Sequence, residues 1–199
     1  MFTRTLNRLL LTISMCCLVA TANAAPIDDA IAAYERGDYA QTLKIFRSLV
    51  AQGDANAQFN LGVMYYKGQG VTQDYKEAVK WYRLATAQGV AQAQFNLGVM
   101  YNKGQGVTQD YKEAVKWYRL AAAQGYPGAQ YNLGVMYDNG EGVTQDYTSA
   151  HMWYNLAAAQ GDADGAKNRD KIAKKMTPQR IEKAQDMARK CQARSFKGC

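Results

Sequence analysis

Histidine and proline are both scarce in this chain of 199 residues. There is one histidine, His151, so any catalytic triad or dyad built on an imidazole would have to use it. Only three prolines are present, which favours long helices and leaves little sequence for extended linkers. Hydrophobic residues make up 48% and charged residues 21% of the chain, a balance typical of a globular rather than a disordered protein.

Long hydrophobic runs are also missing, apart from one short run near the N-terminus. Arg4 and Arg8 precede an apolar stretch over residues 9–19. The small residues Ala22 and Ala24 then stand three positions and one position before a cleavage site at Ala25. This order of features is that of a secretory signal peptide, with cleavage before Ala25. The run is shorter than the roughly 20 apolar residues that a membrane-spanning helix needs. We therefore expect residues 1–24 to be removed and the protein to be periplasmic or secreted.

Four cysteines are present, and two of them fall in the predicted signal peptide. Cys16 and Cys17 raise the alternative of a lipid anchor, but Met15 stands before Cys16 where a small residue is expected. Cys191 and Cys199 would remain after cleavage. In an oxidising compartment a disulfide between them is plausible, and two free or intermolecular thiols are the alternative.

A 36-residue repeat dominates the rest of the sequence. Residues 57–92 and 93–128 are identical at 31 of 36 positions, and residues 129–164 match the second unit at 24 of 36. Near-identical consecutive units of this length are the signature of a repeat architecture.

Each unit divides into two helices. In the first unit, Ala57, Leu61 and Met64 share one helical face, and Gly68 and Gly70 follow it. Asp74 is a good N-cap for a second helix, with Glu77 placed as in a capping box. The small residues Gly62 and Ala78 on the inner faces would allow close helix approach. A pair this short cannot bury its apolar face alone, so we predict an all-α fold in which the pairs stack into an α/α solenoid.

The shared pattern A-x-x-x-L-G-x-x-Y-x-x-G-x-G-V-x-x-D-Y-x-x-A-x-x-W-Y-x-x-A-A-x-Q-G closely resembles the Sel1-like repeat, a relative of the tetratricopeptide repeat. The resemblance implies a right-handed superhelix. It extends more weakly to residues 25–56, which resemble a tetratricopeptide-like first unit with a shorter loop, and to residues 165–199, which resemble basic capping helices and a tail. It also implies a scaffold that holds a protein or peptide partner in a concave groove, as an adaptor or modulator in the bacterial envelope.

Asparagine recurs at one position of the first helix, and related repeats use it there to bind the backbone of an extended peptide. An amide both donates and accepts hydrogen bonds, so it can pair with a peptide group of any sequence. The alternative is that these asparagines cap or bridge neighbouring helices. The aromatic or polar residues on the same face would anchor the partner, although drift at exposed positions also explains their variation. The predicted partner-binding residues are Phe59, Asn60, Tyr66, Phe95, Asn96, Asn102, Tyr131, Asn132 and Asp138.

Catalytic and metal-binding patterns are weak. His151 stands where the previous unit has Val115, as expected for a partly buried helix residue, and it shares no zinc-like spacing with Cys191 and Cys199. The Gly-x-Gly turns lack the third glycine and the preceding strand of a dinucleotide site. We expect no metal, no cofactor and no catalytic residue.

An enzyme that binds or hydrolyses β-lactams, as described for cysteine-rich Sel1-like relatives, is the alternative function. This chain lacks the cysteine pairs that those relatives carry within each repeat. It also lacks the Ser-x-x-Lys motif of serine penicillin-recognising enzymes, since Ser48, Ser149 and Ser195 have no lysine three residues later. We therefore expect no enzymatic activity.

Charge is unevenly distributed, with a net −5 over residues 129–164 and a net +8 over residues 165–199. The basic end has three interpretations: a solvated capping helix, a segment that docks on the acidic third unit or an acidic partner, or a contact with anionic lipid. Nucleic acid is not an expected partner of an exported chain. We expect a monomer.

Overall fold

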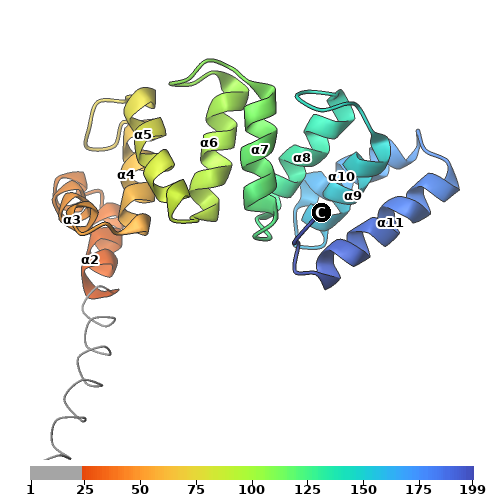
Figure 1. The fold of residues 1–199 in the computed structure, drawn as a ribbon. Helices are drawn as coiled ribbons and strands as arrows, with labels where there is room; N and C mark the ends of the chain where they lie inside the picture. Colours follow the sequence, from red (N-terminus) through yellow and green to blue (C-terminus); the bar gives the residue numbers. More distant parts are fainter. Residues whose placement is uncertain (1–23) are drawn as a thin grey trace, which may run out of the picture.

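The computed structural model describes residues 24–199. The predicted signal peptide therefore lies outside the described residues, except for Ala24 at its end. Ten α-helices and no strand are found in this part of the chain (Figure 1). They are α2 (Ala24–Glu35), α3 (Tyr39–Ala51), α4 (Ala55–Lys67), α5 (Tyr75–Ala87), α6 (Ala91–Lys103), α7 (Tyr111–Ala122), α8 (Pro127–Asn139), α9 (Tyr147–Ala158), α10 (Ala163–Ala173) and α11 (Pro178–Ala193).

Consecutive helices pair into hairpins, and the hairpins stack. Helices α4 with α5, α6 with α7, and α8 with α9 make the three full units, and α2 with α3 forms a shorter one before them. Figure 1 shows these hairpins side by side in a curved row, with α11 lying obliquely across its end. The predicted all-α solenoid is confirmed.

The second helix of each unit begins at an aspartate. The Asp74 carboxylate accepts hydrogen bonds from the backbone N–H groups of Lys76 and Glu77, at 2.8 and 3.1 Å. Asp110 and Asp146 do the same in the next two units. The predicted reciprocal half of the capping box is wrong, because the Asp74 N–H donates to the Tyr65 carbonyl instead.

Small residues let the two helices of a unit meet closely. A Cβ placed on Gly62 would lie 2.7 Å from the ring of Tyr82, and the same is true of Gly98 with Tyr118. Tyr82 and Tyr118 are consequently almost fully buried, at 1% and 0% exposed. The predicted close approach at Gly62 is confirmed.

Glutamine side chains link the ends of the helices in each unit. Gln88, just after α5, donates to the Gln58 side chain at 2.9 Å and to the Gly53 carbonyl of the preceding turn at 3.0 Å. Gln124 repeats both bonds one unit later, to Gln94 and to the Gly89 carbonyl. These bonds tie a unit to itself and to its predecessor without using the hydrophobic core.

Helix α11 docks on the third unit, as one of the three interpretations of the basic end required. Thr177 caps its start and Pro178 takes its first position, as predicted. The Arg180 guanidinium meets the Asp146 carboxylate at 3.1 Å and the Thr148 hydroxyl at 3.1 Å. Trp153 belongs to the same hydrophobic cluster as Ala184 and Ala188 of this helix and is only 4% exposed.

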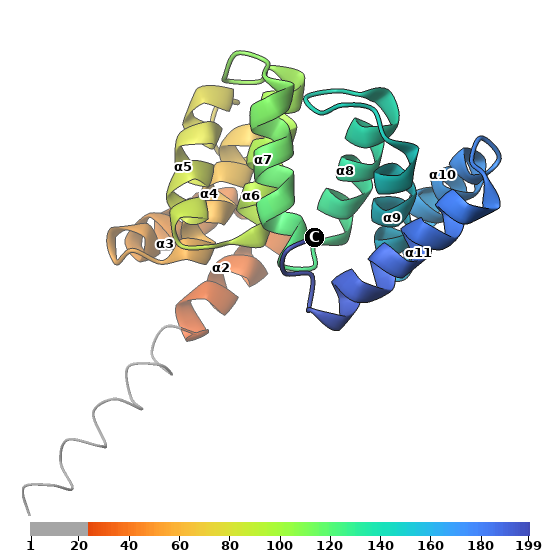
Figure 2. The same ribbon diagram turned by 45° about the vertical axis from the view of Figure 1, so that its right-hand side comes forward.

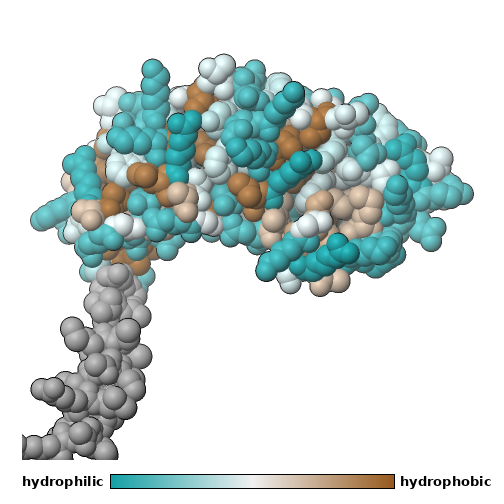
Figure 3. Space-filling model, in the orientation of Figure 1, coloured by the Kyte–Doolittle hydropathy of each residue, from teal (hydrophilic) through white to brown (hydrophobic). Residues whose placement is uncertain are grey.

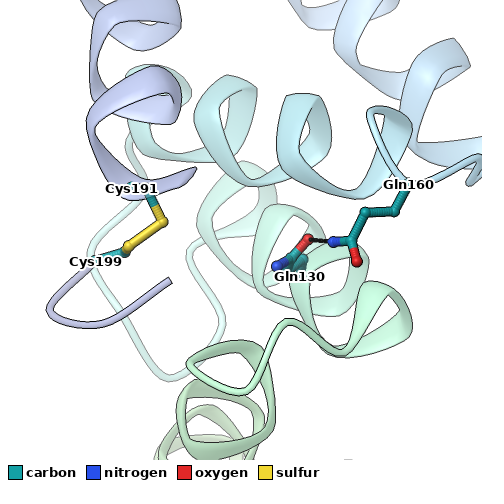
Figure 4. The surroundings of a disulfide bond; sticks show 4 residues. All are labelled: Gln130, Gln160, Cys191 and Cys199. Atoms are coloured by element: carbon teal, nitrogen blue, oxygen red, sulfur yellow. Dashed lines mark hydrogen bonds between the residues drawn. A yellow bond between two sulfur atoms is a disulfide. The ribbon is translucent and has the colours of Figure 1, made fainter. Parts of the chain in front are cut away.

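The end of the chain folds back onto the molecule. Cys191, in the last turn of α11, is joined to Cys199 by a disulfide with a Cα–Cα distance of 5.5 Å (Figure 4). The Phe196 side chain packs on the core formed by the second and third units, and its ring lies against Gly125 in the turn between α7 and α8. The carboxyl terminus lies near the foot of α7 in Figure 2.

Candidate partner-binding groove

The nine predicted partner-binding residues lie on the first helices of the three full units. Helices α4, α6 and α8 each carry three of them at equivalent positions, and all nine are half-buried. We call the surface formed by α2, α4, α6 and α8 the groove. Hollows open on it, the first between α2 and α4 and the second between α4 and α6.

The second hollow, between α4 and α6, has a volume of about 310 Å³. Its floor is the ring of Tyr82 from α5, and its walls combine aromatic, aliphatic and amide side chains. The lining residues are Tyr66, Tyr82, Phe95, Asn96, Val99 and Met100. Five of the six offer apolar or aromatic surface, and the Asn96 amide and the Tyr66 hydroxyl add polar groups, a mixture typical of sites that bind peptides.

The repeated asparagines lie beside buried tyrosine hydroxyls of the preceding unit. Burial raises the pKa of Tyr82, and the Asn96 amide, within reach of the phenol oxygen, opposes that rise. Asn132 stands in the same relation to Tyr118. The Tyr118 hydroxyl is buried and makes no hydrogen bond of good geometry within residues 24–199. This arrangement favours a structural role for Asn96 and Asn132 between neighbouring helices.

Asn168 on α10 continues this series and was missed in the sequence. Its amide donates to the Tyr131 hydroxyl at 3.2 Å, and it opposes the rise in the pKa of Tyr154 that burial causes. The signal was available, because Asn168 follows Asn132 by one repeat length of 36 residues. Around it, however, α10 has lost most of the repeat pattern.

The variable position of the first helix separates the units by chemistry. The Tyr66 ring lies tilted beside that of Tyr75, with ring centroids 5.4 Å apart, and lines the second hollow. Asn102 reaches toward the Tyr118 hydroxyl, and Asp138 adds to the raised pKa of Tyr154. Each of the three side chains therefore lies near a tyrosine of the second helix of its unit.

His151 is enclosed in α9 and 2% exposed. Burial lowers its pKa, the nearby Arg169 lowers it further, and Asp170 opposes both. An imidazole buried in this way has no open approach for a substrate. In the part of the chain that the structure describes, no group of three or more His, Cys, Asp or Glu side chains could hold a metal ion.

No helix between residues 24 and 199 is both long enough and apolar enough to cross a bilayer.

The stacked hairpins, the glycine turns and the repeated aspartate caps define an α/α solenoid built from 36-residue units. A family model described as the Sel1 repeat matches residues 55–90, 91–126 and 127–162, which together make up a little over half of the chain. The chain therefore belongs to the Sel1 repeat family. A comparison with curated proteins finds no match.

Solved structures agree with this assignment. A protective antigen of uropathogenic Escherichia coli with an SLR fold is 41% identical, with a TM-score of 0.69, over 76% of this chain and 34% of that one. A Sel1 repeat protein from Oxalobacter formigenes is 38% identical, with a TM-score of 0.69, over 72% of this chain and 58% of that one. This chain thus spans about a third and just over half of their lengths.

The cysteine-rich protein B of Helicobacter pylori is a more distant neighbour. It is 17% identical, with a TM-score of 0.52, over 65% of this chain and 93% of that one, and shares the fold alone. Sel1-repeat proteins are generally protein-binding scaffolds and are typically not enzymes.

Proposed function

We propose that the protein is an exported adaptor that holds an extended segment of another protein against α4, α6 and α8. The hollow between α4 and α6 carries this proposal, because it presents the aromatic and aliphatic surface of Tyr66, Phe95 and Val99. Hot spots of protein interfaces are enriched in such aromatic anchors. A partner segment lying across the helices would place successive side chains against successive units.

The variable residues of the groove support selection among partners. Tyr66, Asn102 and Asp138 present an aromatic ring, an amide and a carboxylate at one repeated position. The framework around them is kept nearly constant, so the chemistry of the groove changes along its length while the packing does not. A partner would therefore be recognised in one direction and one register.

Export is the second component of the proposal. The N-terminal sequence has the order of a signal peptide, and Cys191 and Cys199 form a disulfide of the kind that persists in oxidising compartments. A periplasmic or secreted location fits both observations.

A site-specific photo-crosslinking experiment tests the binding surface. A photoreactive amino acid is placed at Tyr66 or Val99 in the second hollow, and at Leu84 or Leu120 on α5 and α7 as matched controls. The two leucines are exposed, at 44% and 43%. We expect the groove positions to crosslink one and the same protein in envelope extract and the leucine positions to leave it unlabelled.

A substitution within the hollow completes the test. Val99→Glu puts a carboxylate into the apolar wall, which should weaken capture of the crosslinked protein about tenfold or more, with helicity unchanged by circular dichroism. Crosslinking of that protein mainly from Leu84 and Leu120 would overturn the proposed binding surface.

A further inference from the structure

The first hollow differs from the second in its floor. Between α2 and α4 the buried ring comes from Phe46, which stands one repeat length before Tyr82. At the three later junctions the ring is a tyrosine with an asparagine beside its hydroxyl. At the first junction the hydroxyl is absent, and the hollow has a volume of about 450 Å³.

The missing hydroxyl gives Asn60 different surroundings from those of its equivalents. Its equivalents Asn96 and Asn132 lie beside Tyr82 and Tyr118, whereas Asn60 lines the first hollow together with Phe46, which has no hydroxyl. Phe46 offers Asn60 no hydroxyl, and the Tyr34 hydroxyl of the same hollow donates to the Gln69 side chain at 2.6 Å. The Asn60 amide lines the hollow beside them. A half-buried amide gains by pairing with a polar group that enters from outside.

The wall of the first hollow also differs. Glu35, at the end of α2, borders it where Tyr66, at the end of α4, borders the second hollow. Four of its lining side chains are apolar, and one of them, Ile31, is 42% exposed. The full lining is Ile31, Tyr34, Glu35, Phe46, Phe59, Asn60 and Val63, of which Glu35 alone carries a charge.

We propose that the first hollow receives an arginine side chain of the bound segment. The methylene stem of arginine would pack on Phe46 and Phe59, since long cationic side chains bury their stems against apolar surface. The guanidinium carries several donors in a planar fork, which can pair with the Glu35 carboxylate and the Asn60 carbonyl together. This inference rests on the proposed function, because it names the chemistry of the partner at one end of the same groove.

Binding of short peptides tests the inference directly. The probes are the acetylated pentapeptide amides Gly-Ser-Arg-Ser-Gly and Gly-Ser-Cit-Ser-Gly, where citrulline keeps the shape of arginine without its charge. Titration of the ¹⁵N-labelled protein is followed by NMR. We expect shifts in α2 and α4, and a preference of about threefold to fivefold for arginine, which is the size expected of a partly exposed ion pair.

Two variants separate the floor from the wall. Phe46→Tyr restores the ring that the other junctions already accommodate, so it should fold, engage Asn60 and weaken both peptides about tenfold. Glu35→Gln alters one exposed side chain and should remove the preference for arginine while citrulline binding stays the same. Equal affinities of the two peptides for the unaltered protein, shifts confined to α6 and α8, or no binding at millimolar peptide would overturn the inference.

The crosslinking experiment at Val99 does not depend on the first hollow. Crosslinks from Val99 together with no preference for arginine would overturn this inference and leave the proposed function standing. Loss of the Val99 crosslinks would remove both.

Discussion

At the scale of single residues, one loop glycine in each unit allows close backbone contact with the unit before it. Gly106 has φ of +71°, in the left-handed region that glycine adopts without strain, and a Cβ there would collide with the carbonyl of Tyr75 at the start of α5. Gly142 repeats this contact with Tyr111. The loop between the two helices of a unit is therefore part of the interface between units.

Replacing Gly106 separates this contact from the backbone preference. Gly89 has a similar φ of +84° but nothing within 4 Å of its missing Cβ, so Gly89→Ala is the matched control. We expect Gly89→Ala to lower the free energy of unfolding by about 1–2 kcal/mol, the cost of a left-handed residue. Gly106→Ala should cost clearly more, because the Tyr75 backbone must also move. Chemical denaturation measures both, and equal losses would contradict the argument.

At the scale of elements, α11 depends on contacts that differ from those of the repeats. Its buried side chains Ala184, Ala188 and Cys191 pack on the third unit, and the disulfide returns the chain so that Phe196 reaches Gly125. The third unit is adapted to this helix, because Met152 and Trp153 are buried there while Lys116, the equivalent of Met152, is exposed. Helix α11 therefore fits only the C-terminal end of the stacked hairpins.

Removing the disulfide should loosen this end alone. Closing a nine-residue loop contributes about 2–3 kcal/mol by chain entropy, and each unit of a solenoid contacts only its neighbours. In the Cys191→Ser, Cys199→Ser double variant we expect faster amide hydrogen exchange in α10 and α11 and unchanged exchange in α4 and α5. Phe196→Ala, with the disulfide intact, tests the packing contribution separately. Uniform acceleration over the whole chain would contradict a local role.

At the scale of the whole molecule, the stacked hairpins are joined by similar interfaces. Residues 55–90 and 91–126 are nearly identical units, and each presents the same kind of surface to the next. Stability of such proteins is approximately the sum of unit and interface contributions. The brown patches over α5 and α7 in Figure 3, set among teal side chains, show these two units repeating the same outer surface.

Deleting residues 91–126 should leave a folded and shorter solenoid. The deletion brings α5 against α8, and α5 closely matches α7, which packs there in the intact protein. Gly89 would also take the place of Gly125 beneath Phe196. We expect a cooperative thermal transition at a lower Tm, with helical ellipticity per residue retained. A molten or aggregated product would show that the units are not interchangeable.

The sequence by itself determined the helices, their caps and their stacking into a row. These features depend on residues close together in the chain, such as the apolar face of Ala57, Leu61 and Met64, or the cap at Asp74. They recur three times, so each unit tests the interpretation of the others. The nine candidate groove residues were placed on the first helices for the same reason, although their role in binding stays a prediction.

Only the tertiary structure decided what happens at the two ends and at the junctions. Three features join residues that are distant in sequence. They are the first hollow, the proximity of asparagines to tyrosines of the preceding unit, and the contact of Phe196 with Gly125. A periodic pattern predicts which residues are buried, because burial follows the helical face. It does not predict which side chain of one unit meets which of the next, because that depends on the angle and distance at which the hairpins stack.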